Sequence, residues 1–222
     1  MTVPRYGLDV CFPNGIKGLV FDCDGVLFDS KATNVHYYNL LLHALGLPPM
    51  TSSQEDFIHM QTVGESLRHI VPASHLDKLP QARATIRYRE HILPLLQPEP
   101  GLYELLGWLR SMGLKVAVHT NRTDSMEYVL DHFGMSEFFF PVMTAGKVLG
   151  KPHPEGLQVI MRTWGLPASE IVFIGDSRID EETARAAGVP FWSYRSPSLL
   201  AKMHIADFWT LGQVLREFLD NR

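Results

Sequence analysis

The chain has 222 residues, a formal net charge of -4 at pH 7, and a composition that is 45% hydrophobic and 20% charged. This composition is ordinary for a soluble globular protein, and the length suits one domain or one domain that carries an insertion. The acidic balance gives no electrostatic reason to expect nucleic acid or an anionic membrane as a partner. The two cysteines, Cys11 and Cys23, form neither a disulfide framework nor a zinc-binding pattern.

Residues 1–16 carry no signal that directs the chain to a membrane or out of the cell. They lack the apolar run and small-residue cleavage site of a secretory signal. No apolar stretch in the chain approaches the roughly 18 residues that a membrane span requires. We therefore expect a cytoplasmic protein with no membrane partner. The sequence indicates no role for residues 1–16 themselves.

The first predicted element is a strand over the apolar residues 18–21. Asp22-Cys23-Asp24-Gly25 follows it directly, so two carboxylates stand two positions apart at a strand end and can face the same side. Residues 31–97 then show helical periodicity and no convincing buried strand. This segment begins after Ser30, a plausible helix N-cap, and ends at the stiff sequence Gln97-Pro98-Glu99-Pro100-Gly101. We interpret 31–97 as an inserted α-helical domain, and 1–30 with 98–222 as the core domain.

The remaining elements alternate between short apolar runs and amphipathic segments. Their hydrophobicity is continuous rather than alternating, which suits strands of a parallel sheet that is covered on both faces. The predicted strands are 115–118, 138–142, 171–174 and, less clearly, 190–192. The predicted helices are 103–112, 126–133, 155–164 and 181–187, and a glycine follows each. This alternation predicts an α/β fold with a doubly wound parallel sheet.

Polar residues follow the predicted strands at the edge where such sheets bind ligands. Besides Asp22 and Asp24, this set comprises Thr120, Asn121, Lys151, Asp176 and Asp180. Each of these residues alone has an ordinary interpretation as a turn, a helix cap or a solvated side chain. Their occurrence together, each after an apolar run, favours a functional site.

These residue types are suited to phosphoryl transfer. The Asp22 carboxylate can attack phosphorus and form an aspartyl-phosphate, while Asp24 can protonate the leaving oxygen and later deprotonate water. Clustered carboxylates require a cation, and Mg2+ prefers oxygen ligands. Thr120 and Asn121 can donate hydrogen bonds to phosphoryl oxygens, and Lys151 offsets negative charge.

Four segments resemble the motifs of the haloacid dehalogenase-like hydrolase superfamily. The segments are Phe21-Asp22-Cys23-Asp24-Gly25-Val26-Leu27-Phe28-Asp29-Ser30, Thr120-Asn121, Lys151-Pro152-His153-Pro154, and Gly175-Asp176-Ser177 with Asp180. The resemblance runs from Lys17 through nearly the whole chain. It implies a Rossmann-like core with an inserted helical cap, as in the phosphoglycolate phosphatase and β-phosphoglucomutase group.

The resemblance also implies a role for each site residue. Asp22 is then the nucleophile and Asp24 the acid/base, while Thr120 and Lys151 hold the phosphoryl group. Magnesium is bound by Asp22, the Asp24 backbone carbonyl and Asp176, with Asp180 as a direct or water-mediated ligand. By the same resemblance, a carboxyl at position 24 speaks against the dehalogenases and phosphonoacetaldehyde hydrolases of the superfamily.

The expected activity is magnesium-dependent hydrolysis of a small phosphorylated metabolite such as phosphoglycolate or a sugar phosphate. A β-phosphoglucomutase-like phosphomutase is the alternative, and a non-catalytic binding protein is a third. Residues 61–67 resemble the cap loop that reaches into the site, with Gly64 at its turn as a substrate-binding residue; a plain connection between helices is the alternative. For His119 and Arg122 we expect a structural histidine and a solvated arginine, or else an extension of the phosphate pocket. Oligomeric state cannot be derived from the sequence.

Overall fold

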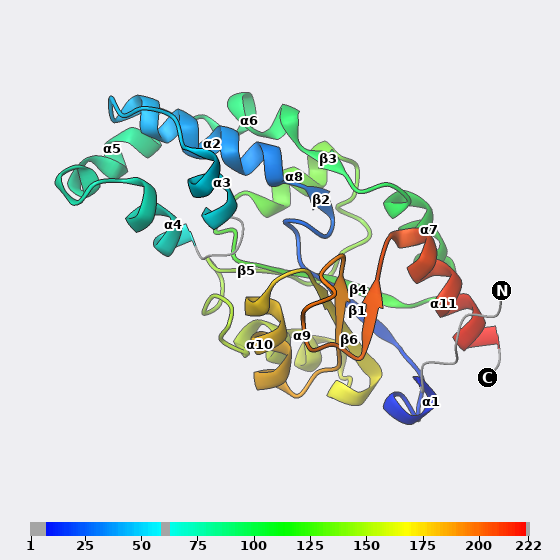
Figure 1. Ribbon diagram of the computed structural model, residues 1–222. Helices are drawn as coiled ribbons and strands as arrows, with labels where there is room; N and C mark the ends of the chain where they lie inside the picture. Colours follow the sequence, from blue (N-terminus) through cyan, green and yellow to red (C-terminus); the bar gives the residue numbers. More distant parts are fainter. Residues whose placement is uncertain (1–7, 59–62, 221–222) are drawn as a thin grey trace. The chain divides into compact units, whose positions relative to one another are not determined.

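A computed structural model describes residues 8–58 and 63–220, which form two compact units (Figure 1). The core unit consists of residues up to Phe28 together with Pro98 onward, and the helical unit is Asp29–Gln97. Two short strands, β2 (Phe28–Asp29) and β3 (Gln97–Pro98), pair with each other where the chain passes between the units.

The core unit contains a six-stranded sheet in the order β5-β4-β1-β6-β7-β8, with every pair parallel. Its strands are β1 (Gly18–Phe21), β4 (Lys115–Thr120), β5 (Val142–Thr144), β6 (Ile171–Gly175), β7 (Phe191–Tyr194) and β8 (Met203–Ile205). The predicted α/β fold with a doubly wound parallel sheet is confirmed. In the central strands Phe21 aligns with Val118 on one side and Ile174 on the other. The carboxyl ends of β1, β4 and β6 therefore meet at one edge.

Two details of the sheet differ from the sequence prediction. The strand expected over 138–142 begins only at Val142 and extends to Thr144, at the edge of the sheet. The strand β8 was not predicted, because a three-residue run carries too little periodicity to be recognised.

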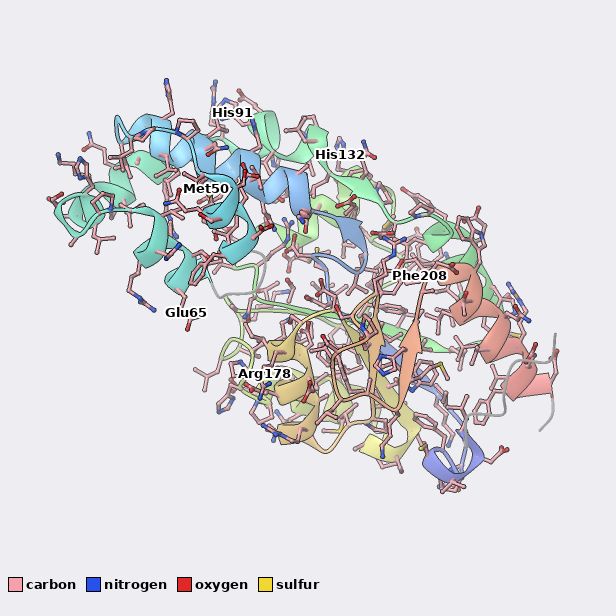
Figure 2. The ribbon with its side chains drawn as sticks, viewed as in Figure 1. Met50, Glu65, His91, His132, Arg178 and Phe208 are labelled. Carbon is pink, nitrogen blue, oxygen red and sulfur yellow. The ribbon has the colours of Figure 1, made fainter. Side chains whose placement is uncertain are left out.

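Helices cover both faces of the sheet. One face packs on α9 (Glu155–Trp164) and α10 (Arg178–Ala187), through a buried cluster that includes Val20 and Phe173. The other face packs on α7 (Leu102–Ser111) and α11 (Phe208–Asp220), which contact each other. Figure 2 shows Phe208 at the start of α11; its ring lies edge-on to that of Phe21, with centroids 6.0 Å apart. A fifth helix, α8 (Met126–His132), packs beside β5.

The start of the described chain packs on the sheet of the core unit. A one-turn helix, α1 (Leu8–Cys11), leads to Phe12, which is completely buried and has its ring centroid 6.0 Å from that of Trp192. Leu8 and Phe12 are therefore part of the buried core, a role that the sequence did not indicate. Cys11 and Cys23 are free thiols.

The helical unit folds around its own apolar cluster, which includes Leu41, Leu42 and Met50 (Figure 2). Its α-helices are α2 (Lys31–Ala44), α3 (Ser52–Ile58), α4 (Val63–Ile70), α5 (Leu79–Ala84) and α6 (Tyr88–His91), with 3-10 turns η1 (Ala73–Lys78) and η2 (Leu93–Leu95). Ser30 is the N-cap residue of α2, as predicted, but its side chain makes no capping hydrogen bond within the described chain. Across residues 8–58 and 63–220, no helix is long and apolar enough to cross a membrane.

Candidate active site

The first site residue, Asp22, directly continues β1. Its backbone N–H donates to the carbonyl of Ile174 at 2.9 Å, which extends the parallel ladder by one residue and fixes where the side chain starts. The carboxylate oxygen Oδ1 accepts a hydrogen bond from the backbone N–H of Cys23 at 2.6 Å and lies 2.7 Å from Lys151 Nζ. The side chain of Asp22 is only 9% exposed. It is therefore held in one direction at the edge of the sheet.

Lys151 provides the positive charge of the site. Its Nζ lies 2.7 Å from Asp22 Oδ1 and 2.6 Å from Asp180 Oδ1, and its side chain is 3% exposed. Burial by itself lowers the pKa of this lysine, but the two carboxylates outweigh burial and raise the pKa above its ordinary value. The ammonium group is therefore charged at neutral pH and bridges the carboxylate of Asp22, which follows β1, and that of Asp180.

Both carboxylate oxygens of Asp180 accept hydrogen bonds. Oδ1 accepts one from Lys151 Nζ, and Oδ2 accepts two from the backbone N–H and the hydroxyl of Ser177, at 3.1 and 2.5 Å. Ser177 and Asp180 form a reciprocal capping box at the start of α10. The sequence Ser177-Arg178-Ile179-Asp180 is the signature of this motif, so this partner of Asp180 was detectable from the sequence and was missed.

Asp176 completes a group of three carboxylates with Asp22 and Asp180. One ligand oxygen of each lies within 4.8 Å of the others. Gly25 makes room for this group, because its φ is +74° and a Cβ at this position would collide with the Asp176 carboxylate. The Asp176 backbone carbonyl accepts a 2.5 Å hydrogen bond from Ser196, a residue that sequence reasoning also missed. The cluster has the all-oxygen donor set that suits Mg2+.

The charge balance of this cluster is incomplete without a cation. Burial, and next the charge of Asp180, raise the pKa of Asp22 to about 7 even though Lys151 opposes them. Burial followed by the charges of Asp180 and Asp22 raises the pKa of Asp176 to about 8. One lysine thus does not compensate the buried carboxylates of Asp22 and Asp180 together with the half-buried carboxylate of Asp176, and a divalent cation would restore their ionised form.

Thr120 and Asn121 lie at the end of β4, as predicted. Thr120 is buried, and its hydroxyl accepts a hydrogen bond from the Arg122 N–H at 3.2 Å, which leaves the hydroxyl proton to be donated elsewhere. The Asn121 side chain instead bonds the backbone of Lys151 twice: Oδ1 accepts from the N–H at 2.7 Å and Nδ2 donates to the carbonyl at 3.1 Å. In this arrangement Asn121 holds the lysine loop, and contact with a phosphoryl group stays a prediction.

Asp24 is paired with Arg122. The arginine Nε donates to Asp24 Oδ2 at 2.8 Å and Nη2 donates to Oδ1 at 2.7 Å. The Arg122 side chain is only 10% exposed, so the expectation of a solvated arginine is wrong. No local pattern indicates this pair, because its two members are 98 residues apart in the sequence.

His119 lies in β4 next to Thr120 and is completely buried. Neither ring nitrogen has a hydrogen-bond partner among residues 8–58 and 63–220, and the ring centroid is 5.9 Å from that of Phe173. Burial, assisted by the charge of Lys151, lowers the pKa of His119 to about 3. The residue is therefore a neutral component of the core, but the expectation of a structural histidine with satisfied polar atoms is wrong in its second part, because both ring nitrogens lack a partner in the described chain.

The remaining predicted site residue, Gly64, lies in the helical unit. It is the second residue of α4 and has no positive φ, so the expectation that Gly64 forms a turn is wrong: Val63–Ile70 is helical. Gln61 and Thr62, part of the same predicted loop, lie outside the described residues.

The fold and these residues indicate the class of protein. A doubly wound sheet with buried carboxylates and a lysine at the carboxyl ends of its central strands is typical of an α/β enzyme with its site at that edge. The family model described as haloacid dehalogenase-like hydrolase matches residues 19–193. The chain therefore belongs to the haloacid dehalogenase-like hydrolase family, and the prediction of a hydrolase of this family is confirmed.

Similar proteins agree with this assignment. A phosphoglycolate phosphatase of Pseudomonas syringae pv. syringae is 38% identical over 187 residues, which cover 78% of this chain and 67% of that protein. A phosphoglycolate phosphatase of Chromobacterium violaceum is 28% identical, with 78% and 82% covered. A crystal structure of a haloacid dehalogenase superfamily hydrolase, subfamily IA, variant 1, from Geobacter sulfurreducens is 34% identical and has a TM-score of 0.78, with 91% of this chain and 98% of that chain covered. The predicted class of enzyme, a phosphatase hydrolase, is confirmed by these relatives together with the family.

Proposed function

We propose that the chain is a magnesium-dependent phosphatase that hydrolyses a small phosphorylated metabolite through an aspartyl-phosphate on Asp22. The observation that carries this proposal is the juxtaposition of Asp22, Asp176 and Asp180 around the buried ammonium group of Lys151. A carboxylate nucleophile can approach a phosphate anion only where positive charge offsets both. Lys151 supplies one such charge from within the chain.

In the first step a carboxylate oxygen of Asp22 forms a bond to phosphorus while the bond from phosphorus to the leaving oxygen breaks. The carboxyl group of Asp24 gives its proton to that leaving oxygen, which departs as an alcohol. In the second step Asp24 takes a proton from water, and the resulting hydroxide attacks phosphorus. Phosphate then leaves, and the Asp22 carboxylate is restored. Thr120 and Lys151 hold the phosphoryl oxygens through both steps.

Magnesium fits the donor set of the site, and Asp22, Asp176 and the backbone carbonyl of Asp24 would hold it. The cation, when bound, would neutralise charge on the phosphoryl group. Asp180 has both of its oxygens engaged by Lys151 and Ser177. We therefore propose that Asp180 contacts the magnesium ion through a water molecule and is not a direct ligand.

The relatives support the choice of substrate class. Those compared above are named phosphoglycolate phosphatases, and a compact carboxylated phosphate ester is accordingly the first substrate to test. We assign the helical unit, Asp29–Gln97, the role of a cap that selects the leaving group. A lid that excludes bulk water during the reaction is a common device in enzymes that transfer phosphoryl groups.

The decisive experiment is phosphate release from a panel of phosphorylated metabolites with and without Mg2+, by wild-type protein and Asp22→Asn. We expect Mg2+-dependent release by the wild type and a loss of at least about 1000-fold in Asp22→Asn, because the amide is not a nucleophile. Asp131→Asn, at an exposed aspartate of α8, is the matched control. Undiminished turnover by Asp22→Asn contradicts the proposal. Conversion of β-glucose 1-phosphate to glucose 6-phosphate faster than phosphate release would indicate a mutase instead.

A further inference from the structure

The carboxylate of Asp176 is held less directly than the other two carboxylates of the cluster. Lys151 Nζ lies 2.7 Å from an oxygen of Asp22 and 2.6 Å from an oxygen of Asp180, and both carboxylates also accept hydrogen bonds from neighbouring backbone N–H groups. In the described part of the chain, the side chain of Asp176 makes neither a hydrogen bond nor an ion pair. Its direction within the cluster therefore depends on how the backbone at position 176 is held.

The hydroxyl of Ser196 holds that backbone. It lies 2.5 Å from the carbonyl oxygen of Asp176, and it must be the donor because a carbonyl oxygen can only accept a hydrogen bond. The strands β6 and β7 pair in a register that aligns Gly175 with Ser193. Asp176 and Ser196 both lie just beyond this aligned pair, so the two chains leave the sheet at the same edge. The contact between them therefore follows from the parallel pairing of the two strands.

Ser196 is itself fixed by its neighbours. Its carbonyl accepts a 2.5 Å hydrogen bond from the hydroxyl of Ser193, which is completely buried. The preceding residue, Arg195, has a φ of +51°, in the left-handed region that residues with a side chain seldom adopt. Its backbone N–H donates to the carbonyl of Ile205 and its Nη1 to Oε1 of the buried Glu99, both at 2.8 Å. A strained residue that its partners hold in place is common beside functional sites.

We propose that Ser196 is a positioning residue for Asp176, and that its hydroxyl fixes the backbone at position 176 so that the Asp176 carboxylate stays directed at the metal site. The inference rests on the proposed function, in which Asp22 and Asp176 bind Mg2+. A hydrogen bond that orients a metal ligand typically changes metal affinity by about 10- to 100-fold, because the ligand must otherwise be ordered when the metal binds.

The test measures metal binding in the absence of substrate. Mn2+ prefers the same oxygen ligands as Mg2+, and the free ion is quantified by its electron paramagnetic resonance signal as it is titrated into the protein. Competition with Mg2+ then gives the affinity for that ion. For Ser196→Ala we expect both dissociation constants to rise about 10- to 30-fold. The stoichiometry of each titration counts the folded molecules, so partial misfolding does not alter the dissociation constant.

Two variants of the same loop separate positioning from a general effect on structure. Ser196→Thr keeps the hydroxyl group, so we expect its dissociation constants to lie within about threefold of those of the wild type. Ser198→Ala removes an exposed hydroxyl two positions further along and should leave them unchanged. An unchanged affinity in Ser196→Ala, a loss that threonine does not restore, or an equal loss in Ser198→Ala would overturn the inference.

Asp176→Asn distinguishes failure of this inference from failure of the proposed function. It removes the charged ligand itself, so we expect a larger loss of Mn2+ affinity than in Ser196→Ala. If Asp176→Asn weakens binding and Ser196→Ala does not, the role of Ser196 is wrong and the proposed function stands. If Asp176→Asn leaves the affinity unchanged, Asp176 is not a metal ligand, and both the inference and the proposed metal site fall. In the double variant we expect no loss beyond that of Asp176→Asn alone, because Ser196 acts only through Asp176.

Discussion

The core unit and the helical unit differ in whether their charged side chains are buried or exposed. The core unit buries Asp22, Lys151 and Asp180 together at the end of its central strands, each less than a tenth exposed. The helical unit buries an apolar cluster, while its four arginines, Arg68, Arg83, Arg87 and Arg89, are all exposed. Buried charge is costly and persists where chemistry requires it, whereas exposed charge is the ordinary state of a helix surface. The difference therefore supports the proposal that the chemical step takes place in the core unit.

Among the variants that test this difference between the units, Lys151→Met is expected to have the largest effect on stability and activity. Removing the ammonium group leaves Asp22 and Asp180 buried without their shared partner, which typically destabilises a protein by about 3–5 kcal/mol. We also expect phosphate release to fall at least about 1000-fold, because the phosphoryl group loses its neutralising charge. Urea unfolding and a phosphate-release assay measure the two effects.

Lys147→Met is the matched control for this variant. Lys147 pairs with Glu127 but is 46% exposed, so its removal should change stability by less than about 1 kcal/mol. Similar behaviour of the two lysine variants would contradict the view that burial marks the chemical site.

A second prediction concerns pH and the metal-free protein. The pKa of Asp176 is raised from 3.8 to about 8, and that of Asp22 to about 7, chiefly by burial. Between about pH 4 and 8 the folded state therefore binds more protons than the unfolded state, so the free energy of unfolding should fall as pH rises through this window. Saturating Mg2+ should reduce this slope, because it holds the carboxylates in their ionised form.

Asp176→Asn isolates the contribution of one carboxylate. The amide stays neutral, so at pH 8 without metal we expect this variant to be more stable than the wild type by roughly 1–3 kcal/mol and to be inactive. Chemical denaturation at several pH values, with and without Mg2+, provides the measurement. A wild-type protein that is equally stable from pH 5 to 8 without metal would refute this account.

A third and smaller effect is expected from Asn121→Ala. This change removes the two hydrogen bonds between the Asn121 amide and the Lys151 backbone, and we expect a loss of about 1–3 kcal/mol in stability. It should also lower kcat by about tenfold, because the loop that carries the lysine is no longer held to β4.

Asn39→Ala provides the corresponding change in the helical unit. Asn39 Oδ1 accepts a 2.8 Å hydrogen bond from the backbone N–H of Met50, so its removal should cost similar stability. We expect kcat to be unaffected in this variant. A kcat that falls equally in both variants would show that the effect of Asn121 is one of stability alone.

The contrast between the units also explains what the sequence could predict. The parallel sheet and the edge that holds Asp22, Thr120, Lys151 and Asp176 follow from short apolar runs, because strand direction fixes where the next residue lies. The Asp24–Arg122 pair could not be predicted in this way. Nothing in the local pattern around either residue encodes a partner that is 98 positions away.

The helical unit was harder to predict. The carboxyl ends of parallel strands lie at one edge of a sheet, whereas the direction of a side chain on a helix depends on its position around the helix axis. In α2 the apolar positions Tyr37, Leu40 and Leu41 recur with helical periodicity, but only Leu41 of these is buried, together with Tyr38 and Leu42. A shift of one position along a helix turns the face by about 100°. The helices and their approximate extent are thus predictable, whereas the residues that face a ligand are not.

The smallest effect is expected from Gly64→Ala, and it tests the only predicted site residue of the helical unit. Gly64 is helical, and among the described residues the atoms that the substitution would bring near the new Cβ are the guanidinium nitrogens of Arg68, at 3.7 and 3.8 Å. Alanine should therefore stabilise the protein by about 0.5–1 kcal/mol. If Gly64 contacts the substrate, KM should rise severalfold at the same time.

Gly107→Ala is the control in the core unit. Gly107 lies within α7, and an added Cβ there would have no atom of residues 8–58 or 63–220 within 4 Å beyond its own helix backbone and chain neighbours, so the same gain in stability is expected with an unchanged KM. Thermal unfolding and steady-state kinetics on both variants make the comparison. If KM is unchanged in both, the substrate role of Gly64 is refuted, and selection of the leaving group must be sought among other residues of the helical unit.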